Sequence, residues 1–98
     1  MSEVEWEIGV PTGNHVATYR GIRIVIQLDQ KGRPLEMGWF IGGHLVESIL
    51  ADRDLESAKR TGIMVVDQRI ALNEVWQQAE KDDRESELGN TPTGSPNF

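Results

Sequence analysis

Two runs in the first third of the chain alternate between polar and apolar residues. In residues 3–8, three glutamates alternate with a valine, a tryptophan and an isoleucine. Successive side chains of a strand point to opposite faces of a sheet, so this period of two predicts a half-buried strand. The run at residues 17–28 places Ile22, Ile24 and Ile26 on one face and predicts one longer strand.

Turn residues and further alternation continue the sheet. Residues 29–33 are polar and include Gly32, which suits the positive φ of a hairpin turn. The chain is expected to return as a strand over about residues 35–41. A glycine pair at residues 42–43 then precedes a shorter strand over about residues 44–49. The pattern indicates an antiparallel sheet of three or four strands.

A change of period from two to 3.6 predicts a long helix. The helix is expected to begin near Asp52 or Asp54, either of which can cap its first N–H groups, and to end near Asp82. Its weak point is Gly62 with the β-branched residues that follow, because glycine in a helix costs about 1 kcal/mol relative to alanine. The alternative to one unbroken helix is a break or kink at this glycine.

These elements together predict an α+β fold with the long C-terminal helix packed on one face of the sheet. The 98 residues suffice for one small domain, expected over residues 1–85. Residues 86–98 are rich in Gly, Pro, Ser, Thr and Asn, and this composition predicts a disordered C-terminal tail that follows an acidic segment.

The charge lies mainly at the two ends. The net charge is −6, from 16 acidic and 10 basic residues, whereas residues 8–79 contain eight of each. Binding to nucleic acid requires clustered Lys and Arg, so no direct nucleic-acid binding is expected. Acidic ends either keep the protein soluble or engage a basic partner, and the sequence leaves both interpretations open.

Composition also limits the chemistry and the compartment. The absence of cysteine excludes disulfides, thiolate catalysis and thiolate zinc sites. No apolar run approaches the roughly 18 residues that a membrane helix needs, and the N-terminus lacks the basic residues of a signal peptide. We therefore expect a cytoplasmic protein that does not enter a membrane.

The two histidines are the only conventional catalytic candidates. Neither His15 nor His44 stands in a recognisable nucleophile or carboxylate motif. His44 and Glu47 would face opposite sides of a strand, which disfavours a metal site. Phosphate-binding and dinucleotide-binding motifs are absent. We expect a protein without catalytic activity, cofactor or metal, and keep an enzyme using either histidine as the third hypothesis.

The predicted helix carries more apolar residues than a small sheet can cover. A homodimer through this helix, or another protein partner, would bury the surplus. Arg69 and Asn73 lie within the apolar arc of this helix, and at an interface these polar residues would set the register of the contact. The candidate interface residues are Ile63, Met64, Arg69, Ile70, Asn73 and Val75.

A second candidate surface is a group of basic residues around the first hairpin. It would bind a small anionic ligand, such as a nucleotide, or an acidic protein surface; the alternative is an ordinary solvated sheet face. The candidate residues are Tyr19, Arg20, Arg23, Lys31 and Arg33.

The segment Gly-Trp-Phe-Ile-Gly-Gly at residues 38–43, followed by Asp-Leu-Glu-Ser-Ala-Lys-Arg at residues 54–60, resembles small phage and prophage proteins. In these proteins a tryptophan-bearing hairpin leads into a helix that opens with Leu-x-x-Ala-Lys. The segment is also similar to the strand-strand-helix core of HicB-type antitoxins, although here no DNA-binding segment follows the helix.

The resemblance implies a class that acts by binding and includes inhibitors of host defence such as anti-CRISPR proteins. We therefore expect a non-catalytic protein that occludes a protein partner, in the host cytoplasm if phage-encoded. An anionic-ligand sponge or sensor, and a HicB-like partner protein, are the alternatives.

Overall fold

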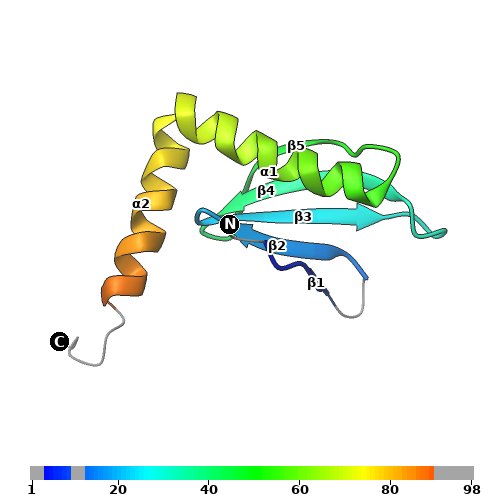
Figure 1. Cartoon of the computed structure of the whole chain (residues 1–98), viewed down its shortest axis with the longest axis horizontal. Helices are drawn as coiled ribbons and strands as arrows, with labels where there is room; N and C mark the ends of the chain where they lie inside the picture. Colours follow the sequence, from blue (N-terminus) through cyan, green and yellow to red (C-terminus); the bar gives the residue numbers. More distant parts are fainter. Residues whose placement is uncertain (1–3, 10–12, 90–98) are drawn as a thin grey trace.

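A single antiparallel sheet and two helices form the part of the chain, residues 4–9 and 13–89, that the computed structural model describes (Figure 1). The sheet order is the order of the chain, with β1 and β5 at its edges. The strands are β1 (Glu7–Ile8), β2 (His15–Tyr19), β3 (Ile22–Leu28), β4 (Pro34–Ile41) and β5 (His44–Leu50). The helices are α1 (Leu55–Leu72) and α2 (Glu74–Gly89).

The α+β class is confirmed, but the expected count of three or four strands is wrong. The run at residues 17–28 contains two strands, because Arg20 and Gly21 form a turn with φ of 51° and 82°. Two consecutive residues with positive φ make the tight turn that matches the twist of a hairpin. The hairpin at residues 29–33 is confirmed. Gly32 has φ of 82°. The side-chain Oδ1 of Asp29 accepts hydrogen bonds from the backbone N–H groups of Lys31 and Arg33.

The expectation of one long helix is also wrong, and the break lies at Asn73 rather than Gly62. Asn73 is extended, with φ of −129° and ψ of 122°, and its N–H donates to the carbonyl oxygen of Arg69 at the end of α1. Its Oδ1 accepts from the N–H of Val75 at 2.8 Å and of Trp76 at 3.4 Å. One side chain therefore caps the start of α2 while its backbone ends α1, and the helices take different directions (Figure 1).

Gly62 serves the packing of α1 on the sheet instead of interrupting the helix. A methyl group at Gly62 would lie only 3.0 Å from Cγ2 of Ile24. The Gly62 carbonyl oxygen accepts a hydrogen bond of 3.1 Å from Nε1 of the buried Trp39. The missing side chain lets α1 approach β3 and β4 closely enough for this bond.

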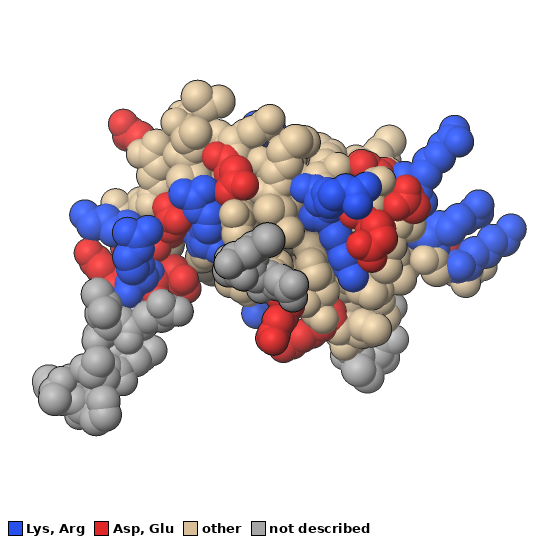
Figure 2. Space-filling view, viewed as in Figure 1, with Lys and Arg blue, Asp and Glu red and all other residues tan. Residues whose placement is uncertain are grey.

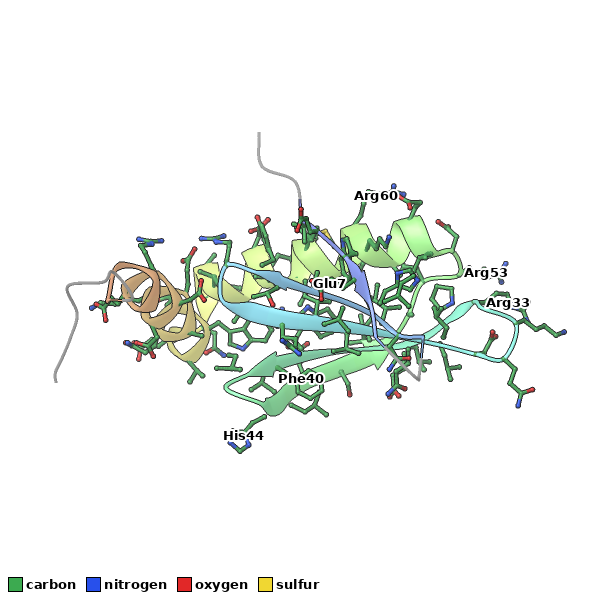
Figure 3. The ribbon with its side chains drawn as sticks, turned by 90° about the horizontal axis from the view of Figure 1, so that it is seen from below. Glu7, Arg33, Phe40, His44, Arg53 and Arg60 are labelled. Carbon is green, nitrogen blue, oxygen red and sulfur yellow. The ribbon has the colours of Figure 1, made fainter. Side chains whose placement is uncertain are left out.

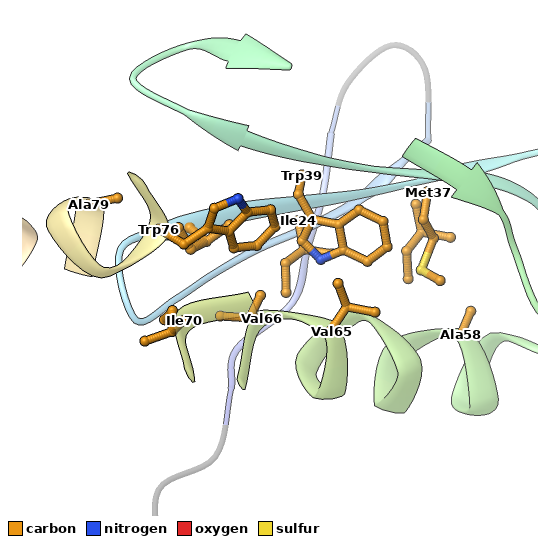
Figure 4. Packing of buried hydrophobic residues seen from close by; sticks show 11 residues of the cluster. Ile24, Met37, Trp39, Ala58, Val65, Val66, Ile70, Trp76 and Ala79 are labelled. Carbon is orange, nitrogen blue, oxygen red and sulfur yellow. The ribbon is translucent and has the colours of Figure 1, made fainter. Parts of the chain in front are cut away.

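The core lies between α1 and one face of the sheet and extends to the first turns of α2 (Figure 4). The sheet contributes Ile22, Ile24, Ile26, Met37 and Trp39. The helices contribute Ala58, Val65, Val66, Ile70, Trp76 and Ala79.

α2 packs through Trp76 and Ala79 and then continues to Gly89, beyond the domain end expected at residue 85. Residues 86–89, which the composition assigned to the tail, therefore belong to α2. The rest of the expected tail, residues 90–98, lies outside the described residues.

Candidate functional site

The structure does not bring the five candidate residues of the basic group together. Tyr19 and Arg20 lie at the turn between β2 and β3, whereas Lys31 and Arg33 lie at the turn at the other end of β3 (Figure 1). Arg23 alternates with the buried isoleucines of β3 and therefore faces the opposite side of the sheet. In Figure 2, acidic and basic side chains are interspersed over most of the visible face, whereas basic side chains project together at its right-hand end.

Arg20 instead joins the sheet to both helices. Its Nε donates to Oε2 of Glu80 at 2.6 Å, and its Nη1 donates to Oδ1 of Asp67 at 2.8 Å. The Tyr19 hydroxyl also donates to Oδ1 of Asp67, at 3.0 Å. The hydrogen bonds from Arg20 to Glu80 and Asp67 raise the pKa of Arg20 further above its usual value. Burial, and then the bond to Asp67, raise the pKa of Tyr19. The cluster holds α2 against the β2–β3 turn.

A second ion pair links α1 to β5. Arg69 donates to both carboxylate oxygens of Glu47, from Nε at 2.8 Å and from Nη2 at 2.6 Å. Hydrogen bonding by Arg69 lowers the pKa of Glu47, against the opposing effect of burial. The guanidinium expected in a dimer interface is thus bound within its own chain.

The lowered pKa of Glu47 predicts an acid-dependent loss of stability. A carboxylate with a lower pKa in the folded state stabilises that state fully above its usual pKa, 4.5 for Glu47, and loses this effect as the pH falls through the lowered value. The difference in free energy of unfolding between the wild type and Glu47→Gln should therefore be largest near neutral pH and shrink in this acidic range. Urea unfolding at a series of pH values measures it; a difference independent of pH would contradict the proposed role of this pair.

The remaining helix candidates divide between the core and the surface. Ile70 is buried in the core and Ile63 packs against it. Asn73 is the residue between the helices. Met64 and Val75 are exposed, and so is Leu72, which the helical periodicity placed on the apolar stripe that faces the sheet.

The histidines are separated by two strands. His15 lies on β2, where burial and then the charge of Lys59 lower its pKa, and its Nδ1 is buried without a hydrogen-bond partner. His44 is exposed at the start of β5 (Figure 3). Within the described ranges, no hydrogen bond or ion pair joins either ring to a carboxylate, and no group of three or more His, Asp or Glu is placed to hold a metal. Over the same residues, no helix is both long and apolar enough to cross a membrane.

The surface that the sequence did not identify is the sheet face opposite the helices, here called the open face. Figure 3 shows Phe40 on this face, with Arg60 of α1 on the other side of the sheet. The strand register brings four apolar residues together on this face. Val16 pairs with Val25, which in turn pairs with Gly38. Phe40, two residues after Gly38 on β4, pairs with Leu45 of β5. A methyl group at Gly38 would meet Cδ1 of Leu45 at 2.9 Å. The apolar centre of the open face is therefore Val16, Val25, Phe40 and Leu45.

Phe40 stands between two hollows of the open face. One hollow extends toward Gln27 and Glu36, the other toward Thr18 and the glycine pair at residues 42–43, and both are lined by Val25 and Phe40. The sequence does contain a signal for this surface: Val25 and Phe40 are apolar, although they alternate with the residues of β3 and β4 that face the core.

Neither a protein-family model, nor a curated protein, nor a solved structure matches this chain.

Proposed function

We propose that this chain is a non-catalytic binding protein whose open face docks on a protein partner and blocks the surface it covers. The observation that carries the proposal is the apolar centre of the open face, which neither helix covers because α1 packs on the other side of the sheet. Apolar patches rimmed by polar residues typify interaction sites.

The composition of the open face supports a protein partner. Phe40, between two hollows, has the place of an aromatic anchor near the centre of an interface. Thr18, Arg23, Gln27 and Glu36 lie around the apolar centre on the same face. A polar rim around an apolar centre is the usual organisation of protein interfaces.

Two of the candidate arginines are bound within the chain and are not available to a ligand or partner in this arrangement. Arg20 and Arg69 hold the helices to the sheet, so these charges have a structural role. The most specific form of the proposal is a phage-encoded inhibitor that occludes a host defence complex such as CRISPR-Cas in the host cytoplasm. Its support is the resemblance of residues 38–43 and 54–60 to small phage and prophage proteins. Within this segment Trp39 is buried in the core, whereas Phe40 lies on the open face.

Site-specific photocrosslinking tests the proposal. p-Benzoyl-phenylalanine replaces Phe40 in one variant and Met64, on α1, in a matched control, each produced in cells of the source organism, or of its host if the protein is phage-encoded. We expect the variant at position 40, and not the control, to give a covalent adduct with one other protein. Adducts only from position 64, or from neither position, would contradict the proposal.

The captured protein then allows a quantitative check. Introducing a charge in the apolar centre by Val25→Asp should weaken binding to the purified partner at least about tenfold, the effect of losing about 1.4 kcal/mol at an interface. Met64→Asp should leave the affinity unchanged. Equal affinities of Val25→Asp and the wild type would contradict a contact through the open face.

A further inference from the structure

We infer that β5 is a self-pairing edge, through which two copies of this chain join their sheets into one continuous sheet. β5 has seven residues, His44–Leu50, without lysine or proline, and lies at one end of the strand order. An edge strand leaves one row of N–H and C=O groups unpaired, and natural proteins usually shield such edges. The opposite edge is shielded in this way: β1 has only two residues, one of them Glu7.

Exposed apolar side chains concentrate on the same strand. Of the large hydrophobic side chains that are exposed among the described residues, Leu45, Val46 and Leu50 belong to β5. Leu50 is 80% exposed, whereas its neighbour Ile49, on the other face of the strand, packs against the core. α1 lies over β3 and β4, so it leaves the outer edge of β5 uncovered.

Two features that usually shield edges are present but leave half of β5 open. The register shifts by one residue between the pairs Trp39–Glu47 and Phe40–Leu45, so Val46 is the extra residue of a bulge. Glu47 points to the core side, but Arg69 neutralises it. From Glu47 to Leu50 the pairing with β4 is regular and no charge faces outward.

The backbone of this regular half fixes how a second copy can pair. The N–H of Ala51 donates to Leu35 of β4, and antiparallel strands alternate in which residues bond across the pair. The N–H and C=O groups of Ser48 and Leu50 therefore point away from β4. An antiparallel twofold centred on Ile49 places Ser48 of each copy opposite Leu50 of the other, so both residues bond in both copies.

Charge and packing favour this register. It places Glu47 opposite Ala51 of the second copy, so no like charges face each other, and it places the two Ile49 side chains together. It also avoids the bulge at Val46. A strand that pairs with itself is self-complementary, as a twofold interface requires. Both open faces would then lie on the same side of the joined sheet.

Light scattering during size exclusion, from micromolar to millimolar concentration, tests the inference with a matched pair of variants. Leu50 and Leu72 are 80% and 82% exposed, but only Leu50 lies on β5. The wild type and Leu72→Lys should reach twice the 11.0 kDa of one chain, whereas Leu50→Lys should remain at 11.0 kDa. Circular dichroism should show all three folded.

A wild type that stays at 11.0 kDa at every concentration would overturn the inference, and so would dissociation by Leu72→Lys as readily as by Leu50→Lys. The first result would leave the proposed function intact, because the crosslink from Phe40 concerns a different protein and the side chains of the open face, whereas self-pairing uses the backbone of β5 from Glu47 to Ala51.

The register has its own test, because the chain has no cysteine. Facing residues of a non-hydrogen-bonded antiparallel pair have Cα atoms about 4.5 Å apart, within the range of a disulfide. Ile49→Cys should therefore oxidise to a covalent dimer faster than Ser48→Cys. The reverse order would overturn the register centred on Ile49.

Discussion

Replacing Trp39 with alanine should lower the free energy of unfolding by about 3–5 kcal/mol, the usual cost of truncating a buried aromatic side chain. Trp39 is fully buried between the sheet and α1, and its Nε1 donates to the Gly62 carbonyl (Figure 4). Small domains have a total stability of about 5–15 kcal/mol, so the variant should lose much of its margin. Urea unfolding followed by circular dichroism measures the change.

Trp39→Phe separates packing from the hydrogen bond. Phenylalanine keeps a large ring but removes the N–H, which leaves the buried Gly62 oxygen without this donor. We expect a smaller loss, about 1–3 kcal/mol. A loss below about 1 kcal/mol for Trp39→Ala would contradict the packing of α1 on the sheet, because cavity formation alone exceeds it.

Gly21→Ala should displace α2 and destabilise the fold more than a backbone effect alone can. Gly21 has φ of 82°, and a methyl group there would lie 2.8 Å from the carbonyl oxygen of Ala79 and 2.9 Å from Cβ of Asp83. The left-handed conformation costs a non-glycine residue about 1–2 kcal/mol. The collision with α2 should add about 1–3 kcal/mol.

Gly32→Ala is the matched control, because Gly32 has the same φ of 82° with nothing within 4 Å of the added methyl group. Gly32→Ala should lower the free energy of unfolding only by the cost of the left-handed conformation. Equal losses of unfolding free energy for the two variants would show that α2 does not pack on the β2–β3 turn.

The sequence predicts β3, β4 and β5 because their alternation and turn residues are local. The turn at Arg20 escapes such reasoning for two reasons. The pair Tyr19–Ile22 places an odd-numbered and an even-numbered residue on the core face, and this change of phase is a weak signal because only Ala17 and Tyr19 of β2 show it. The left-handed Arg20 is held by Asp67 and Glu80, 47 and 60 residues further along the chain.

The break at Asn73 is hidden for a similar reason. Trp76 and Ala79 stay in phase with the apolar stripe of α1, and both are buried after the change of direction. The extended backbone of Asn73 and its capping hydrogen bonds distinguish two helices from one.

The open face depends on where the helices lie, and that is a tertiary property. The sequence shows Val25 and Phe40 out of phase with the core, but not that α1 and the ion pairs of α2 hold both helices to the other side of the sheet. The five residues of the basic group do not form one surface because they occupy opposite faces and opposite ends of β3.

The location of the partner contact is tested most directly by the methyl NMR spectrum of the labelled chain, recorded during addition of the protein crosslinked through Phe40. Both sides of the molecule carry exposed or half-buried methyl groups, Val25 and Leu45 on the open face and Leu72 and Val75 on the helices. Binding through the open face predicts shifted or broadened signals from Val25 and Leu45, with Leu72 and Val75 unchanged. Changes confined to Leu72 and Val75 would contradict the account and move the contact to the helices.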